Sequence, residues 1–261
     1  MPDDDKLLVS RSSSIVTITL NDPPRNPIGM AMIDRLETLL PELDQDKEVR
    51  AVIFTGAGEK SFSSGGNIKE FAAGISKMTL EGFLAQRLKV LSLVENLSKP
   101  AIAAIRGTCL GGGLELALCC HFRIVAEDAE LGLPEIELGV IPAWGGTQRL
   151  PRAIGVQRSL EMMLRNKKIS GAEAVKIGLA NESCAPNQVL PQATALAGEL
   201  SEKPPLAVAA ILKAVIQGMD RPFQQGLALE LEGIRKTSGS KDNLEGISAF
   251  LQKRKPRFRG E

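Results

Sequence analysis

The chain has 261 residues, with 32 Lys and Arg against 31 Asp and Glu, which gives a formal net charge of +1. This balance provides no overall attraction to nucleic acid or to an anionic membrane surface, so we expect a partner that is recognised locally. The four cysteines form no C-x-x-C pair, which argues against a disulfide framework or a zinc site. The N-terminus carries three aspartates rather than an apolar run, and no stretch reaches the ~18 apolar residues of a membrane span. We therefore expect a cytoplasmic protein.

Short strands and helices alternate over the first part of the chain. Apolar alternation predicts a strand over 16–20, and helical spacing predicts a helix over 30–43. The same criteria predict strands at 51–55, 101–105, 122–126 and 130–133, and helices at 80–97 and 111–120. This alternation indicates an α/β fold with crossover connections.

After about residue 155 the predicted elements are helices. Ser170 and Glu173 match a capping box, and Pro204, Pro205 and Gly218 mark the start and end of a further helix. The other helices are predicted at 156–165, 222–235 and 244–253.

Three glycine-centred segments, 62–69, 107–115 and 133–150, stand out as candidates for function. Adjacent glycines before a helix expose backbone N–H groups, and the helix N-terminus adds positive potential, so residues 111–113 suit an anion or a developing oxyanion. A tight turn between strand and helix explains the same glycines. The P-loop and Rossmann glycine patterns are absent.

Two glutamates in these segments are candidates for acid–base chemistry. Glu115 lies in an apolar helix, where a carboxylate is costly unless it is paired or useful. Glu135 follows Pro134 in another apolar run. The alternatives are a first-turn glutamate that complements the helix dipole and a solvated loop carboxylate, and we expect Glu137 to be of the solvated kind.

The sequence GGGLE, the PE twenty residues further on and IPAWGGTQRLPRAIG resemble the enoyl-CoA hydratase/isomerase (crotonase) superfamily. The likeness runs from about residue 6 to the C-terminus, and the ending 241–261 is especially similar to the methylglutaconyl-CoA hydratase branch. It implies a crotonase (ClpP-like) α/β fold, in which repeated ββα units form a spiral core over 1–195. It also implies a C-terminal helical trimerisation region over 196–261, and hence a homotrimer or a dimer of trimers.

The resemblance implies reversible hydration of a 2-enoyl-CoA to a 3-hydroxyacyl-CoA by Glu115 and Glu135. Superfamily isomerases and decarboxylases generally lack one of this pair. By analogy, the N–H groups of Gly66 and Gly112 form the oxyanion hole, and the N–H of Ala143 helps to hold the catalytic water. No metal or redox cofactor is expected, because the sequence has no metal-ligand cluster or dinucleotide fingerprint, and coenzyme A is part of the substrate. The family's substrate contacts correspond here to Arg25, Pro27, Ser64, Asn67, Ile68, Leu110 and Trp144, with Phe250 and Lys253 lent to a neighbouring subunit.

The chain departs from the family pattern at three places. Gly66-Asn67 stands where Ala-Asp is common, and the only histidine, His121, replaces a usual Asp and is expected to be structural. Trp144 replaces a small residue. Its ring would narrow the acyl pocket, stack on a flat acyl group, or point outward and fill the core.

Other functions fit the sequence less well. A Δ3,Δ2-enoyl-CoA isomerase or another CoA lyase of the superfamily is the main alternative. A serine hydrolase lacks a nucleophile-elbow pattern. Some relatives bind RNA through a lysine-rich first helix, but the matching residues 36–50 hold five acids against two bases, which disfavours RNA binding.

Overall fold

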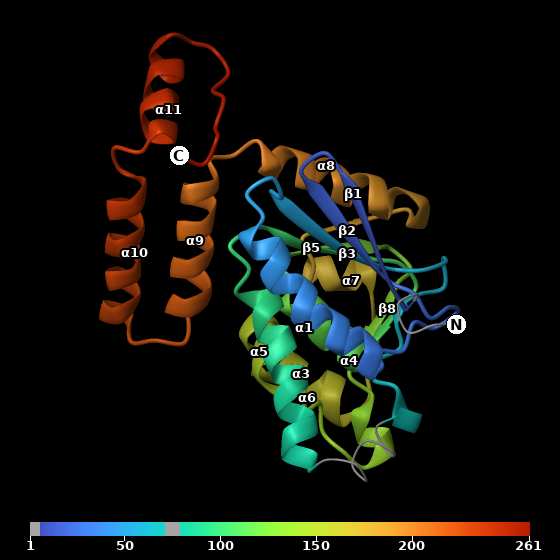
Figure 1. The fold of residues 1–261 in the computed structure, drawn as a ribbon. Coiled ribbons are helices and arrows are strands. Elements are labelled where there is room, and N and C mark those ends of the chain that lie inside the picture. The colour runs from blue at the N-terminus through green and yellow to red at the C-terminus, as the bar shows by residue number, and fades with distance from the viewer. Residues whose placement is uncertain (1–5, 71–78) are drawn as a thin grey trace.

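The computed structural model describes residues 6–70 and 79–261, which form two β-sheets with surrounding helices (Figure 1). The larger sheet has the strand order β1 (Leu7–Ser12), β2 (Ile15–Leu20), β3 (Ala51–Gly56), β5 (Ala101–Ile105), β7 (Phe122–Ala126), β10 (Glu182–Cys184). The smaller sheet has the order β4 (Ser61–Ser63), β6 (Thr108–Leu110), β8 (Glu130–Gly132), β9 (Ile169–Ser170). Only the outermost pairs β1–β2 and β8–β9 are antiparallel among these described strands.

Successive strands go to different sheets, and this builds the predicted ββα repeat. The pairs β3–β4, β5–β6 and β7–β8 each place one strand in the larger sheet and one in the smaller. They are followed in turn by α3 (Leu80–Glu95), α4 (Gly112–Cys119) and the 3-10 turn η2 (Glu135–Leu138). Every residue of β3 and β5 is buried, as expected for parallel strands covered on both faces. The expected α/β architecture of ββα units is confirmed.

Helices cover this core through the faces that their apolar residues define. α1 (Met30–Gln45) buries the six residues at helical spacing, from Met32 to Leu43, and packs against α3. α8 (Val189–Ser201) packs on β3, β5 and β7 and buries Val189, Ala193 and Ala197. Further helices of the core are α5 (Gly146–Ile154), α6 (Val156–Leu164), α7 (Gly171–Lys176) and the 3-10 turn η3 (Pro186–Gln188). Ser170 caps α7 by accepting the N–H of Glu173, as the capping box predicted.

The last three helices, α9 (Pro205–Gly218), α10 (Phe223–Thr237) and α11 (Lys241–Leu251), stand apart from the core (Figure 1). α9 and α10 form a hairpin, and α9 has no buried residue within the chain. The division into 1–195 and 196–261 stays a prediction, and its boundary lies inside α8, which belongs to the core by its packing.

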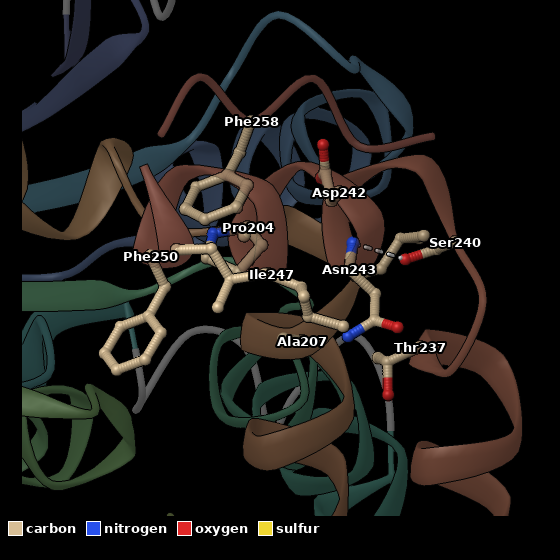
Figure 2. A pocket seen from close by; sticks show the side chains of 12 residues that line it. Pro204, Ala207, Thr237, Ser240, Asp242, Asn243, Ile247, Phe250 and Phe258 are labelled. Atoms are coloured by element: carbon tan, nitrogen blue, oxygen red, sulfur yellow. Dashed lines mark hydrogen bonds between the residues drawn. The ribbon is translucent and has the colours of Figure 1, made fainter. Parts of the chain in front are cut away.

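The C-terminal tail folds back on α11 and is held there. The Asp242 carboxylate accepts the N–H groups of Arg259 and Gly260 at 2.7 and 2.8 Å. An apolar pocket lies beside this contact, between α11, the start of α9 and Phe258 of the tail (Figure 2). Among the helices that the structure describes, none is both long and apolar enough to cross a membrane.

Candidate active site

The first two glycine segments meet where β4 and β6 end. Gly65 has φ +102°, and a Cβ there would lie 2.9 Å from the Leu110 carbonyl oxygen and 3.2 Å from the Gly112 nitrogen. Glycine is therefore needed both for this backbone conformation and for the close approach. Gly112 is the first residue of α4, so its N–H has no acceptor within the helix. Within residues 6–70 and 79–261, the N–H groups of Gly66 and Gly112 have no hydrogen-bond acceptor.

Glu115 lies one turn into α4, with only 2% of its surface exposed. Its Oε1 accepts the backbone N–H groups of Trp144 and Gly146, each at 2.8 Å. A Cβ at Gly146 would lie 2.9 Å from this oxygen, so glycine there lets the carboxylate reach the start of α5. The buried carboxylate is thus held by two N–H donors at a helix N-terminus, an arrangement that stabilises negative charge.

Glu135 approaches the same place from η2. β6 and β8 are parallel neighbours, so the segments that follow them start at the same edge of the smaller sheet. A Cβ on Gly111, which has φ +51°, would lie 2.9 Å from the Glu135 Oε1. The Glu135 Oε2 is buried, and no described group forms a hydrogen bond with it. Glu115 and Glu135 therefore both lie beside Gly111–Gly112.

Burial is the main influence on both carboxyl groups. Burial raises the pKa of Glu115 to about 7, and the negative charge of Glu135 raises it further. The N–H groups of Gly146 and Trp144 and the positive charge of Arg149 act in the opposite direction and lower it. Burial also raises the pKa of Glu135. The pKa of Glu115, raised to about 7, suits proton exchange near neutral pH.

The Trp144 ring faces this site rather than pointing outward. It is 8% exposed. A Cβ at Gly66 would lie 3.2 Å from its Cζ2, and a Cβ at Gly112 would lie 2.5 Å from its Cζ3. The ring thus packs beside Gly66 and Gly112, the two glycines whose N–H groups have no acceptor among the described residues. Ala143, the preceding residue, is half-buried, and its N–H has no acceptor in the described parts of the chain.

Most of the other residues expected to bind substrate lie in or next to the segments that form this site. Arg25 is exposed, and its carbonyl oxygen accepts the Ser64 N–H. Ile28, which follows Pro27, forms an isolated β-bridge with Gly66. The Asn67 amide donates to Glu70 at 2.9 Å, and Ile68 is exposed. Leu110 directly precedes Gly111. In contrast, Phe250 and Lys253 lie on and just after α11, outside this cluster within one chain (Figure 1).

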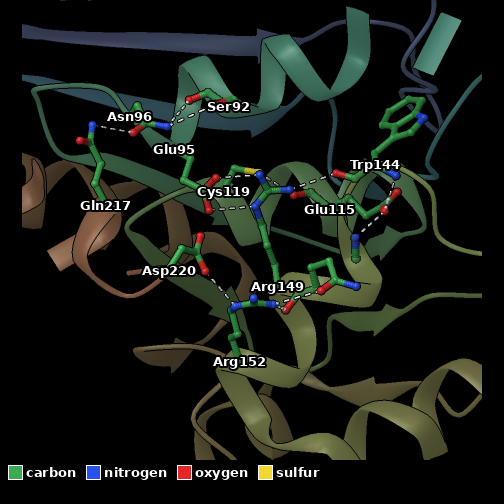
Figure 3. Close-up of polar contacts among 12 residues, drawn as sticks. Ser92, Glu95, Asn96, Glu115, Cys119, Trp144, Arg149, Arg152, Gln217 and Asp220 are labelled. Carbon is green, nitrogen blue, oxygen red and sulfur yellow. Dashed lines mark hydrogen bonds and ion pairs between the residues drawn. The ribbon is translucent and has the colours of Figure 1, made fainter. Parts of the chain in front are cut away.

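A polar network behind the site was not predicted from the sequence. Arg149 donates from Nε and Nη2 to the two carboxylate oxygens of Glu95, at 2.9 and 2.7 Å, and from Nη1 to the Trp144 carbonyl oxygen at 3.1 Å (Figure 3). Arg149 belongs to the GGTQRL sequence that carries the family resemblance, but its partner Glu95 lies 54 residues earlier. Only the fold reveals this pairing.

His121 belongs to the same network and is structural in its contacts. Its Nδ1 accepts the Ala101 N–H at 2.9 Å, so its Nε2, 3.2 Å from the Glu95 carbonyl oxygen, carries the proton. In the two described stretches, no group of three His, Cys, Asp or Glu side chains is placed to hold a metal ion.

The buried carboxyl group of Glu115 and the partly buried one of Glu135, beside two unpaired N–H donors, are suited to acid–base chemistry on a substrate that develops negative charge on an oxygen. Comparison with known proteins agrees. The family described as enoyl-CoA hydratase/isomerase matches residues 10–261, and the chain belongs to this family.

Its relatives include a probable enoyl-CoA hydratase of Bacillus subtilis, which is 40% identical over 95% of this chain and 96% of its own length. A crotonyl-CoA hydratase of Syntrophomonas wolfei is 34% identical, over 97% of this chain and 98% of its own length. The crystal structure of an enoyl-CoA hydratase from Bacillus anthracis matches with a TM-score of 0.91 and 36% identity, covering 98% of this chain and 100% of that one. The crotonase fold and the likeness to the hydratase branch are thereby confirmed.

Proposed function

We propose that the chain catalyses the reversible hydration of 2-enoyl-CoA thioesters to 3-hydroxyacyl-CoA thioesters. The observation that carries this proposal is the placement of Glu115 and Glu135 beside Gly112. Hydration needs one group to take a proton from water and another to deliver a proton to carbon, and both carboxyl groups are present. The names of the relatives support the same reaction.

In this mechanism the thioester carbonyl oxygen accepts the N–H groups of Gly66 and Gly112. Addition of water to the β-carbon moves an electron pair onto that oxygen, and the two donors stabilise the resulting enolate. One such donor is typically worth ~10²–10³ in rate. Because the donors belong to the backbone, they depend on the loop conformation that Gly65 and Gly111 allow.

The two carboxyl groups complete the proton balance. The pair holds one proton between its members. Its ionised member takes a proton from the attacking water, and its protonated member gives a proton to the α-carbon, so the pair ends with the same total charge. The unpaired Ala143 N–H is suited to orient the water. Dehydration follows the same steps in reverse, and no cofactor is required.

The proposed substrate has a short acyl group. Trp144 packs against both oxyanion glycines, and its ring takes up space that a small residue would leave beside the reacting carbons. The crotonyl-CoA hydratase among the relatives acts, by its name, on a four-carbon thioester. For the CoA part, Arg25, Pro27, Ser64, Asn67, Ile68 and Leu110 line the rim in our proposal.

The proposed assembly is a homotrimer or a dimer of trimers. α9 buries no residue, and α10 and α11 leave large apolar side chains exposed, including Phe223 at 77% and Phe250 at 82%. Such a surface is typical of an interface between subunits. Assembly would bring Phe250 and Lys253 to the CoA of a neighbouring subunit. Sedimentation equilibrium should give three or six times the mass of one chain, and a monomer would contradict this assembly.

The function is tested with the purified protein and a panel of straight, branched and cyclic 2-enoyl-CoA thioesters. Loss of the conjugated double bond is followed by absorbance, and the product is identified by mass as substrate plus water. The proposal predicts the fastest turnover with short acyl groups. Absence of hydration with the whole panel would contradict it.

A further inference from the structure

A bidentate ion pair joins α3 to α5 behind the candidate active site (Figure 3). Glu95 is the last residue of α3, and both of its carboxylate oxygens accept from Arg149, at 2.9 and 2.7 Å. The two side chains are only 27% and 18% exposed. Paired, partly buried contacts of this geometry are stronger and more directional than exposed ion pairs. The Arg149 guanidinium is therefore fixed in position.

The third contact of Arg149 reaches the turn of residues 143–146. Its Nη1 donates to the Trp144 carbonyl oxygen at 3.1 Å. Gly145, the next residue, has φ +103°, and a Cβ there would lie 2.1 Å from Nη1. The guanidinium thus packs directly on the backbone of this turn. The same turn supplies the Trp144 and Gly146 N–H groups to the Glu115 Oε1.

Glu95 is itself anchored to the core. Its carbonyl oxygen accepts from His121, and the His121 ring accepts the N–H of Ala101 at the start of β5. Asn96, the next residue, accepts from Gln217 of α9 at 3.1 Å. A continuous series of polar contacts therefore runs from β5 through Glu95 and Arg149 to the turn that holds Glu115.

We propose that Arg149, fixed by Glu95, is a positioning residue for hydration, which holds the turn of residues 143–146 so that its N–H groups orient the Glu115 carboxylate. This inference rests on the proposed function. Arg149 does not contact the reacting atoms. It acts through the Trp144 backbone and through its charge.

The charge gives this role a signature that packing alone does not produce. The ionisable groups that face Glu115 are Glu135 from η2, Arg149 from α5 and Cys119 from its own helix, with Glu95 of α3 beyond Arg149. Arg149 lowers the pKa of Glu115, against burial and the charge of Glu135, which raise it. Removal of the cation should therefore move the pH dependence of hydration to higher pH.

The test compares Arg149→Gln, Arg149→Lys and Glu95→Gln in the full-length protein, with hydration of crotonyl-CoA as the assay. Arg152→Gln is the matched control, because Arg152 lies on the same helix, is largely exposed and pairs with Asp220 at the surface. Arg149→Gln should lower kcat by about 10- to 100-fold with KM within about 2-fold, as expected for a misplaced catalytic group. The pH dependence of its kcat should move to higher pH.

The other variants separate charge from geometry. Lysine keeps the positive charge but cannot form the bidentate contact with Glu95. Arg149→Lys should therefore have a lower kcat, while its pH profile stays near that of the wild type. Glu95→Gln should lose kcat without the upward shift, because Arg149 keeps its charge. Thermal unfolding of each variant identifies one that does not fold, in which case Arg149→Lys and Glu95→Gln provide the kinetic comparison.

Two results would overturn the inference while leaving the function intact. One is an Arg149→Gln variant with the kcat and pH profile of Arg152→Gln. The other is a loss of kcat in Arg149→Lys and Glu95→Gln no larger than in the control. If the wild type itself fails to hydrate any thioester, the proposed function fails instead, so the two failures are distinguishable.

Discussion

The Trp144 ring packs on Gly112, where an added Cβ would lie 2.5 Å from the ring carbon Cζ3, while the Trp144 N–H donates to Glu115 at 2.8 Å. The Trp144 backbone therefore holds one proposed catalytic carboxylate, and its side chain packs against the glycines of the proposed oxyanion hole. Substitution of the side chain leaves the backbone contact in place, so the two roles are separable.

Trp144→Ala should widen the range of acyl groups that the enzyme accepts. Removal of the indole creates space beside the reacting carbons. Each additional methylene group of the acyl chain that fits into this space should raise kcat/KM by about 10-fold or more. The ratio of kcat/KM for an eight-carbon over a four-carbon enoyl-CoA should rise by at least about 10-fold. Trp144→Phe serves as the intermediate case, and a thermal melt checks folding, because loss of a buried Trp costs about 3–5 kcal/mol. An unchanged chain-length profile would refute a role in specificity.

Gly112→Ala should reduce hydration strongly, because the new methyl group must displace either the Trp144 ring or the N–H that faces the substrate. A close contact with a side chain can be relieved by shortening that side chain. The double variant Gly112→Ala with Trp144→Ala should therefore recover activity relative to Gly112→Ala alone. Rates of all four proteins form a double-mutant cycle, and strict additivity would show that the ring and the glycine are not coupled.

Glu115→Gln should stabilise the fold at alkaline pH. The folded-state pKa of Glu115 is about 7, against an ordinary value of 4.5, so between these values the native protein binds the proton that the unfolded chain releases. The stabilisation of the native state by this bound proton is fully present below pH 4.5 and is lost as the pH rises through 7. The difference corresponds to about 3 kcal/mol.

Urea unfolding at fixed protein concentration measures this effect. Glu115→Gln should exceed the wild type in unfolding free energy by up to about 3 kcal/mol at pH 8, with little difference at pH 4.5. The Gln side-chain oxygen can still accept the two N–H groups. Equal stability of the two proteins at pH 8 would contradict a buried, charge-destabilised Glu115.

His121 should be neutral with its proton on Nε2 across the physiological range. Burial is the main cause that lowers its pKa, so the unfolded chain binds the proton more readily. Stability is therefore full above pH 6.5 and is reduced as the pH falls below that value. Because it is the only histidine, a ¹⁵N NMR spectrum of the imidazole reports it directly. A protonated ring at pH 6.5, or a proton on Nδ1, would be inconsistent with its contacts.

Much of the fold was predictable because its elements carry strong local patterns. The apolar spacing from Met32 to Leu43 predicted α1, and the buried runs predicted β3 and β5. α5 was missed because it opens on glycines and contains Pro151, both unfavourable in a helix interior. α8 has no capping side chain at its start and was also missed. β1 was not predicted as a separate strand. All but one of its residues are exposed, so its pairing with β2 is not visible in its own pattern.

The candidate site was predictable only in part. Glu115, Glu135 and the glycines were identified through a family motif. Without that motif, a structural role explained each of them equally well. The Trp144 orientation depends on a turn with Gly145 at φ +103°, and the Glu95–Arg149 pair joins two helices far apart in sequence. Such contacts depend on tertiary packing that a linear pattern does not contain.

The most direct test of the two-glutamate mechanism is the rate of crotonyl-CoA hydration by the wild type, Glu115→Gln and Glu135→Gln. Glu137→Gln is the matched control, because Glu137 is exposed on η2. A 3-enoyl-CoA isomerisation assay runs in parallel. Loss of either Glu115 or Glu135 should lower kcat for hydration by about 10²–10⁴-fold, while Glu137→Gln should behave like the wild type. Hydration that survives within about 10-fold in either site variant, or isomerisation as the only activity with dependence on one glutamate, would contradict the two-glutamate mechanism.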